Sequence, residues 1–138
     1  MNPETLEQAF RKGFGVFWNK GTVENFYDFF DDRALMVDED TPFLLEKPAF
    51  KEHVDFHLSG IWDKLEWIPR DPKFVVVGST GIVNTYFTLR GKPKDAGFRL
   101  RHGIVTIVCS YDAAASQWRA ASMLLDPLLG HIENASPT

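Results

Sequence analysis

Two histidines, His53 and His57, lie four residues apart in the stretch FKEHVDFHLSG, and imidazole is the side chain best suited to moving protons near neutral pH. On a helical wheel that starts at Phe50, both fall on the apolar face with Val54 and Leu58. Three interpretations stay open: a metal site, a buried pair satisfied by its neighbours, or a pair that lines a ligand pocket. We expect no metal, because the glutamate of the metalloprotease motif is missing and a third ligand is needed. For a pocket, His57 is the candidate acid–base group and His53 a ligand contact, because His57 is nearer the end where the helix meets the sheet.

A second group of candidates is the acidic stretch VDEDTP, in which Asp38 and Asp40 fall on the same face of an extended chain. Two carboxylates that share a partly dry site raise the pKa of one of them, and this yields a usable base. The alternative is a solvated strand end beside a turn. The pattern predicts Asp40 or Asp38 as the catalytic base if chemistry takes place here.

Groups that hold a ligand oxygen are expected further along the chain. Arg99 and Arg101 alternate onto one strand face in FRLRH, so Arg101 can anchor a carboxylate, or else pair with an acid at a subunit contact. Tyr86 shares a strand face with Asn84 and can contact either a ligand or a partner sheet. The aromatic surplus suggests a pocket for a planar or apolar ligand, although for each ring taken alone a place in the core is favoured. The candidate wall residues are Phe14, Trp18, Phe43, Trp62 and Trp67.

Composition limits the classes of function. The chain has 138 residues, 44% of them hydrophobic and 14% aromatic, with a net charge of −4, which suits one domain with a real core. Lysine and arginine form no basic stripe, so we expect no nucleic-acid partner. No stretch approaches the ~20 apolar residues of a membrane span. The sequence has a single cysteine, Cys109, which suits a reducing compartment. We therefore expect a cytoplasmic protein. Without a glycine-rich phosphate loop or nucleophile elbow, we expect no cofactor.

Periodicity predicts helices early in the chain and long strands late. Helical patterns run from Pro3 to Phe17, from Val23 to Phe30 and from Pro48 to Ile61. The extended stretches are residues 34–45, 62–69, 73–78, 81–91, 98–111 and 117–125, and Pro69 and Pro72 mark a bulge, an edge or a turn. Segregated helices and strands indicate an α+β fold.

This order resembles the nuclear transport factor 2-like superfamily, which includes the ketosteroid isomerase and SnoaL-like families. Three stretches carry the resemblance: GTVENFYDFFDDRALMVDED, FKEHVDFH and RLRHGIVTIVCSYDAAASQWRAASMLLDPLLG. It covers about Thr5 to Leu129 and implies a cone-shaped, curved antiparallel sheet wrapped around three N-terminal helices and a deep apolar pocket. It also implies a homodimer formed through the sheet face. We expect one SnoaL-like domain over residues 1–133 and a flexible tail over 134–138.

The chain departs from the family's catalytic patterns. Ser122 and Leu124 stand where many SnoaL-like members carry His-x-His, and the first helix lacks the tyrosine of ketosteroid isomerases. The residue set of limonene epoxide hydrolases is also absent. Two hypotheses remain. The first is a pocket that binds a small apolar or carbonyl-containing molecule, with isomerase, cyclase or dehydratase chemistry if it is an enzyme. The second is a non-catalytic domain for ligand sensing, dimerisation or assembly.

Overall fold

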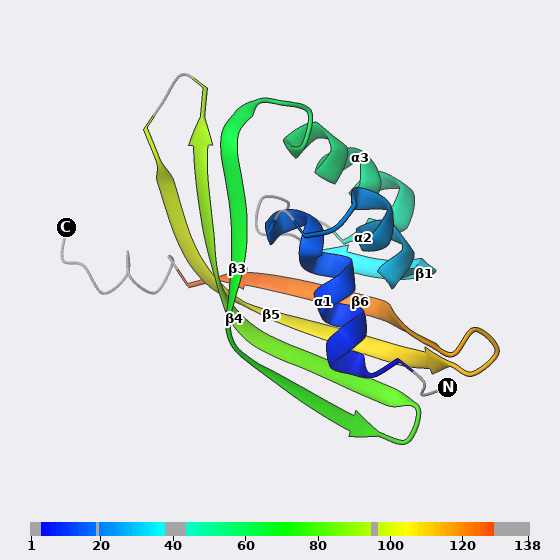
Figure 1. The fold of residues 1–138 in the computed structure, drawn as a ribbon. Coiled ribbons are helices and arrows are strands. Elements are labelled where there is room, and N and C mark those ends of the chain that lie inside the picture. Colours follow the sequence, from blue (N-terminus) through cyan, green and yellow to red (C-terminus); the bar gives the residue numbers. More distant parts are fainter. Residues whose placement is uncertain (1–3, 19, 38–43, 95–96, 129–138) are drawn as a thin grey trace.

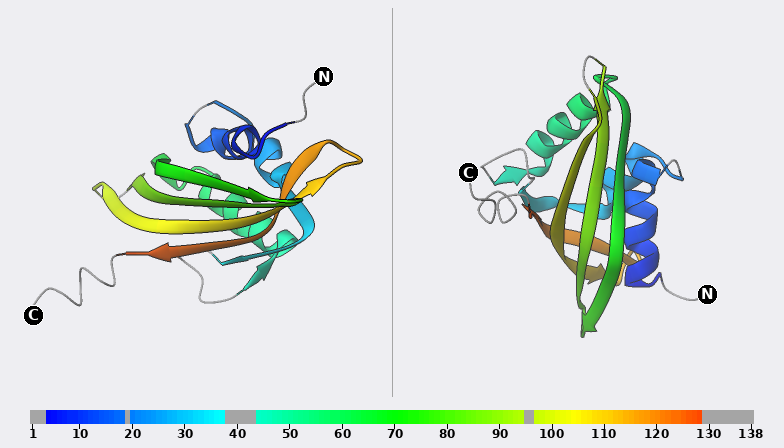
Figure 2. Two further views of the ribbon diagram at one scale, coloured as in Figure 1. Left: turned by 90° about the horizontal axis from the view of Figure 1, so that it is seen from below. Right: turned by 90° about the vertical axis from the view of Figure 1, so that its left-hand side faces the viewer.

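The structure, a computed structural model, describes residues 4–18, 20–37, 44–94 and 97–128. Three helices lie in the concave face of one strongly curved, six-stranded sheet (Figure 1). Two further views show that the sheet bends around the helices without closing into a barrel (Figure 2). The predicted α+β cone is confirmed.

The first helix, α1, spans Leu6–Phe14 and begins at a capping box in which Thr5 and Gln8 exchange hydrogen bonds. The sequence pattern predicts one continuous helix to Phe17, but the helix ends at Phe14. A short 3₁₀ turn, η1, follows over Gly15–Trp18. The tighter turn keeps Phe14 and Phe17 directed towards the sheet while the chain reverses into the next helix.

Helix α2 spans Val23–Phe29, and the Thr22 hydroxyl caps it by accepting a hydrogen bond from the backbone N–H of Asn25. Helix α3 spans Lys47–His57 and has Pro48 in its first turn, where a missing backbone N–H costs nothing. The Tyr27 hydroxyl donates a 2.6 Å hydrogen bond to the Asp55 carboxylate and so ties α2 to α3. Burial, followed by this bond to Asp55, raises the pKa of the Tyr27 phenol.

The strands are β1 (Phe30–Val37), β2 (Leu45–Glu46), β3 (Trp62–Val77), β4 (Thr80–Pro93), β5 (Arg99–Asp112) and β6 (Gln117–Pro127). They pair in the order β2-β1-β6-β5-β4-β3. All neighbours are antiparallel except β1 and β6, which run parallel, so the predicted all-antiparallel sheet needs this correction. The reason is topological: after β2 and α3 the chain enters the sheet at its far edge and zigzags back to β1.

Strand β3 joins the two extended stretches that the sequence predicts on either side of Pro69 and Pro72. It is an edge strand, where proline costs no ladder hydrogen bond on its open side. Its register against β4 shifts between Arg70 and Lys73, and Asp71 between them has a φ of 53°. The bulge and the edge predicted from the two prolines are both confirmed.

An aromatic cluster fills the space between the helices and the sheet. Phe10 is fully buried, and its ring centroid lies 4.9 Å from that of Phe14 and 5.8 Å from that of Phe74. Phe26 packs edge-on against both Phe14 and Phe30. These contacts connect α1, α2, β1 and β3, so the aromatic surplus mainly forms the core.

Cys109 is buried on the concave face of β5 and is 1% exposed. Burial in apolar surroundings raises the pKa of its thiol to about 12. The thiolate is the reactive form, so Cys109 acts as a small core residue in the folded protein.

Candidate functional site

A hollow lined mainly by hydrophobic side chains lies between α3, the aromatic cluster and the concave face of the sheet. We call it the apolar cavity. Its volume is about 100 Å³. Of its fifteen lining residues, thirteen are hydrophobic and the other two are His53 and His57. No carboxylate lines this cavity among the residues that the structure describes, so the two imidazoles supply its polar chemistry.

One wall is a stacked pair of rings. Trp67 on β3 and Phe87 on β4 lie with centroids 5.3 Å apart and planes 23° from parallel. Phe14 closes this wall from α1, with its ring centroid 4.9 Å from that of Trp67. Aromatic rings from three different elements therefore form a large part of the cavity wall.

The last turn of α3 places the histidines at the cavity. Their ring centroids are 4.6 Å apart, in an edge-to-face arrangement. The indole N–H of Trp62 donates to Nδ1 of His57 over 3.1 Å. An indole nitrogen only donates, so Nδ1 of His57 is the acceptor and the neutral ring carries its proton on Nε2. Trp62 thus fixes His57 as a hydrogen-bond donor through Nε2.

A second hollow of about 160 Å³ adjoins the apolar cavity and shares four lining residues with it, among them His57 and Trp62. It adds Arg99 and Arg101, which alternation along β5 brings to the concave face. A Cβ at Gly91 would lie 2.8 Å from the Trp62 ring, so only glycine there lets the indole pack closely against β4. The hollow that adjoins the apolar cavity, called the mouth from here on, therefore bears two guanidinium groups.

The structure brings together several of the residues that the sequence singles out. Phe14, His53, His57 and Trp62 line the apolar cavity, and Arg101 lines the adjoining mouth. Two others have different surroundings. Trp18 donates its indole N–H to the Trp67 carbonyl and packs on Phe10 without lining either hollow.

Tyr86 lies away from both hollows. It is 52% exposed on the convex face of β4, because its neighbour Phe87 takes the concave position, and it lines neither hollow. Asp38, Asp40 and Phe43 lie outside the described residues.

Sequence reasoning selected Trp67 as a possible wall residue but did not select Phe87 and Leu89. All three line the cavity, and Trp67 pairs with Leu89 across the ladder between β3 and β4. The alternation along residues 81–91 does place Phe87 and Leu89 on one face. It does not indicate which face looks into the cone, and that information requires the position of the helices.

Two negative findings apply to the described part of the chain. No three His, Cys, Asp or Glu side chains there are grouped as metal ligands would be. No helix there has the length and apolar character needed to cross a membrane.

The curved sheet, the helices inside it and the cavity between them define the nuclear transport factor 2-like fold. An NTF2-like protein from Cytophaga hutchinsonii matches with a TM-score of 0.68 at 14% identity, over 88% of this chain and 94% of that one. A protein from Novosphingobium aromaticivorans, provisionally named a scytalone dehydratase, matches with a TM-score of 0.74 at 11% identity, over 88% and 80% of the two chains.

A third solved structure, the CaMKII hub of S. rosetta, has a TM-score of 0.71 at 18% identity, over 91% of this chain and 99% of the hub. No protein-family model matches the sequence, and a comparison with curated proteins finds no significant match. At these identities the likeness demonstrates a common fold, and function has to be argued from the site itself.

Proposed function

We propose that this protein binds a small apolar molecule bearing a carbonyl or carboxylate oxygen, with its hydrocarbon part in the apolar cavity. The supporting observation is the pairing of a hydrophobic, ring-lined hollow with His57 and two guanidinium groups at its mouth. An apolar interior with a few convergent polar groups is the usual construction of a small-molecule site. The oxygen of the ligand would face His57 and Arg101.

The size of the hollow limits the ligand. Dry, apolar protein cavities of roughly 150 Å³ bind benzene. A cavity of about 100 Å³ with a mouth of about 160 Å³ therefore suits a single aromatic ring and a short substituent. The His57 Nε2–H is a donor, so it recognises the oxygen of a ketone, aldehyde or carboxylate and discriminates against a pure hydrocarbon.

An enzymatic form of this proposal is proton transfer next to the carbonyl group. His57 would polarise the oxygen, and a base would remove a proton from the adjacent carbon. Asp40 or Asp38 is the base that the sequence suggests, and His53 is the only other titratable group among the described cavity-lining residues. Exchange of the α-hydrogens of a bound ketone with D₂O separates this enzymatic form from simple binding.

The test compares three single-ring compounds of similar size: acetophenone, benzoate and ethylbenzene. We expect the first two to raise the melting temperature, with about 2.7 kcal/mol of added stability at 100 times Kd, and ethylbenzene to raise it less. His57→Ala should weaken acetophenone binding about tenfold, the value of one hydrogen bond at the upper end of the usual range.

His102→Ala is the matched control, because His102 pairs with the Thr88 hydroxyl outside both hollows. This variant should keep the full ligand-induced shift. Equal affinity for acetophenone and ethylbenzene, or an unchanged response in His57→Ala, would remove His57 from the site. A lack of response to all three compounds would contradict the binding function.

A homodimer through the convex sheet face is the second part of the proposal. Val75, Ile82 and Val108 are direct cross-strand neighbours on that face and are 51%, 37% and 37% exposed. Tyr86 and Leu124, which are 52% and 51% exposed, extend the patch across β4 and β6. Contiguous exposed apolar surface of this kind marks an interaction site, and a second copy offers the same surface in return.

A cytoplasmic location is compatible with the lone buried Cys109.

Val108→Lys tests the dimer. A lysine ammonium buried between two sheets without a partner should weaken association at least about 100-fold, so we expect the variant to be a monomer by sedimentation while the parent chain is a dimer. Val76→Lys is the matched control, because Val76 is 54% exposed but points to the other face of β3. A monomeric parent chain would overturn the dimer. A larger assembly would favour an assembly role like that of the hub domain.

A further inference from the structure

One end of the molecule, which we call the basic tip, projects beyond the helical layer (Figure 1). It is formed by residues 56–66, which connect the end of α3 to the start of β3, by residues 90–94 of β4 and by residues 97–101 at the start of β5. These segments lie side by side, because Trp62 pairs with Pro93 in the β3–β4 ladder. The basic tip is at the top of Figure 1 and of the right-hand view in Figure 2.

Large apolar side chains are exposed at the basic tip. Phe56 and Phe98 are 59% and 54% exposed, and they are the only exposed phenylalanines among the residues that the structure describes. Ile61 and Leu100 are exposed at the same end. The other described phenylalanines pack in or against the aromatic core, so both departures from that rule fall at one place. Grouped exposed apolar side chains of this kind mark an interaction site.

Positive charge is concentrated at the same end. Over residues 56–66 and 90–101 the sequence holds six lysines and arginines but only three acids. The rest of the sequence holds nine lysines and arginines against sixteen acids. The basic tip is therefore positive in a chain whose net charge is −4, and it attracts a negatively charged partner.

Ion pairs within the basic tip leave part of this positive charge uncompensated. Asp63 and Glu66 are the acids that take part in them, with three cations of β3 and β4. Lys94 and Arg99 are exposed and have no carboxylate partner among the described residues. Their charges are available to a partner in solution.

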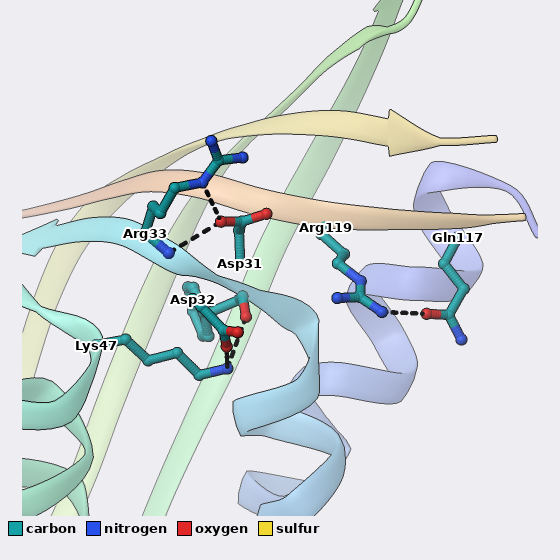
Figure 3. Close-up of polar contacts among 7 residues, drawn as sticks. Asp31, Asp32, Arg33, Lys47, Gln117 and Arg119 are labelled. Atoms are coloured by element: carbon teal, nitrogen blue, oxygen red, sulfur yellow. Dashed lines mark hydrogen bonds and ion pairs between the residues drawn. The ribbon is translucent and has the colours of Figure 1, made fainter. Parts of the chain in front are cut away.

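The turn between α2 and β1 shows the opposite arrangement. Arg33 lies 3.2 Å from Asp31, and Lys47 lies 3.2 Å from Asp32 (Figure 3). Each of these cations has a carboxylate of its own, so their positive charge is compensated within the chain. Charge complementarity therefore directs an anionic partner to the basic tip.

An anionic lipid surface fits this combination of side chains. Phenylalanine and aliphatic residues enter the boundary between headgroups and acyl chains, while lysine and arginine beside them attract anionic headgroups. The basic tip projects from the molecule, which suits contact with a flat surface (Figure 1). A second copy of the basic tip would oppose it with the same positive charge.

We propose that the protein docks on anionic membranes through the basic tip, as a peripheral contact in which no segment crosses the bilayer. Phe56 and Phe98 enter the interface, and Lys94 and Arg99 contact the headgroups. Arg99 also lines the mouth, so a docked protein presents the mouth to apolar molecules dissolved in the bilayer. That consequence rests on the proposed function, whereas the docking itself does not.

The test is cosedimentation of the ligand-free protein with vesicles of phosphatidylcholine alone or with about 30% phosphatidylserine. We expect at least about tenfold tighter binding to the anionic vesicles at low ionic strength, and most of this difference should disappear in high salt. Phe98→Ala should weaken binding about tenfold, because less apolar surface enters the interface. Since no ligand is added, the result does not depend on what the apolar cavity binds.

Lys64→Glu combined with Lys94→Glu tests the charge and should weaken binding at least about tenfold. Lys12→Glu combined with Lys73→Glu is the matched control: it makes the same change of net charge on α1 and near the bulge of β3, so binding should fall less than about threefold. Val77→Ala is the control for Phe98→Ala, because Val77 is 70% exposed at the opposite end of the β3–β4 ladder. It should leave binding unchanged.

The outcomes separate the parts of this proposal. No binding to either kind of vesicle would overturn membrane docking in favour of an acidic protein partner. Equal binding to the two kinds of vesicle, or equal losses in the two charge-reversal variants, would overturn recognition of anionic lipid by the basic tip. Binding that Phe98→Ala leaves unchanged would overturn insertion of the aromatic side chains.

Discussion

Phe10→Ala is expected to lower the free energy of unfolding by about 3–5 kcal/mol, a large part of the stability of a domain of this size. The ring is 0% exposed and packs against Phe14, Trp67 and Phe74, which come from both the helical layer and the sheet. Its removal leaves a void that rigid aromatic neighbours cannot fill. Urea unfolding followed by tryptophan fluorescence measures the change.

Phe56→Ala is the control for Phe10→Ala, because it makes the same chemical change at a solvent-exposed position. Phe56 is 59% exposed on α3, so the expected loss is below about 1 kcal/mol. Similar losses in the two variants would mean that the aromatic cluster does not carry the stability of the fold.

Gly103→Ala should also be strongly destabilising, by about 2–3 kcal/mol, although it adds only a methyl group. A Cβ at this position would lie 2.4 Å from the Phe87 ring and 2.8 Å from the carbonyl oxygen of Asp126. The backbone of β6 holds that carbonyl in place, so the Phe87 ring has to move. Since Phe87 lines the apolar cavity and stacks on Trp67, we expect the variant to lose affinity for acetophenone as well as stability.

Gly97→Ala is the control for that substitution, because nothing lies within 4 Å of a Cβ built there. It should change stability by less than about 0.5 kcal/mol and leave ligand binding intact. Normal acetophenone binding by a destabilised Gly103→Ala protein would show that the position of Phe87 does not shape the cavity.

Local pattern was sufficient to predict much of the fold. The regular alternation of residues 81–91 places Val83 and Phe87 on one face of β4 and Ile82 and Tyr86 on the other, as the structure has them. The parallel pairing of β1 with β6 could not be predicted in this way. It depends on where the chain re-enters the sheet after α3, and periodicity within a strand carries no information about its neighbour.

The position of the candidate site residues was predictable where a helix carries them. The wheel position of His53 and His57 was enough to direct both towards the interior, and both line the apolar cavity. The tautomer of His57 was not predictable, because its determinant, Trp62, lies on a strand and contacts it only after the chain has turned.

The parallel pairing of β1 with β6 has a consequence for biosynthesis. Residues 30–37 leave the ribosome early, but their sheet neighbour spans residues 117–127 and is made late. Until then β1 has only the two residues of β2 as a ladder partner, and the nascent helices have no complete sheet to cover. Productive folding of the cone should therefore begin only once nearly the whole domain has been translated, and the high contact order of this closure should make folding slow.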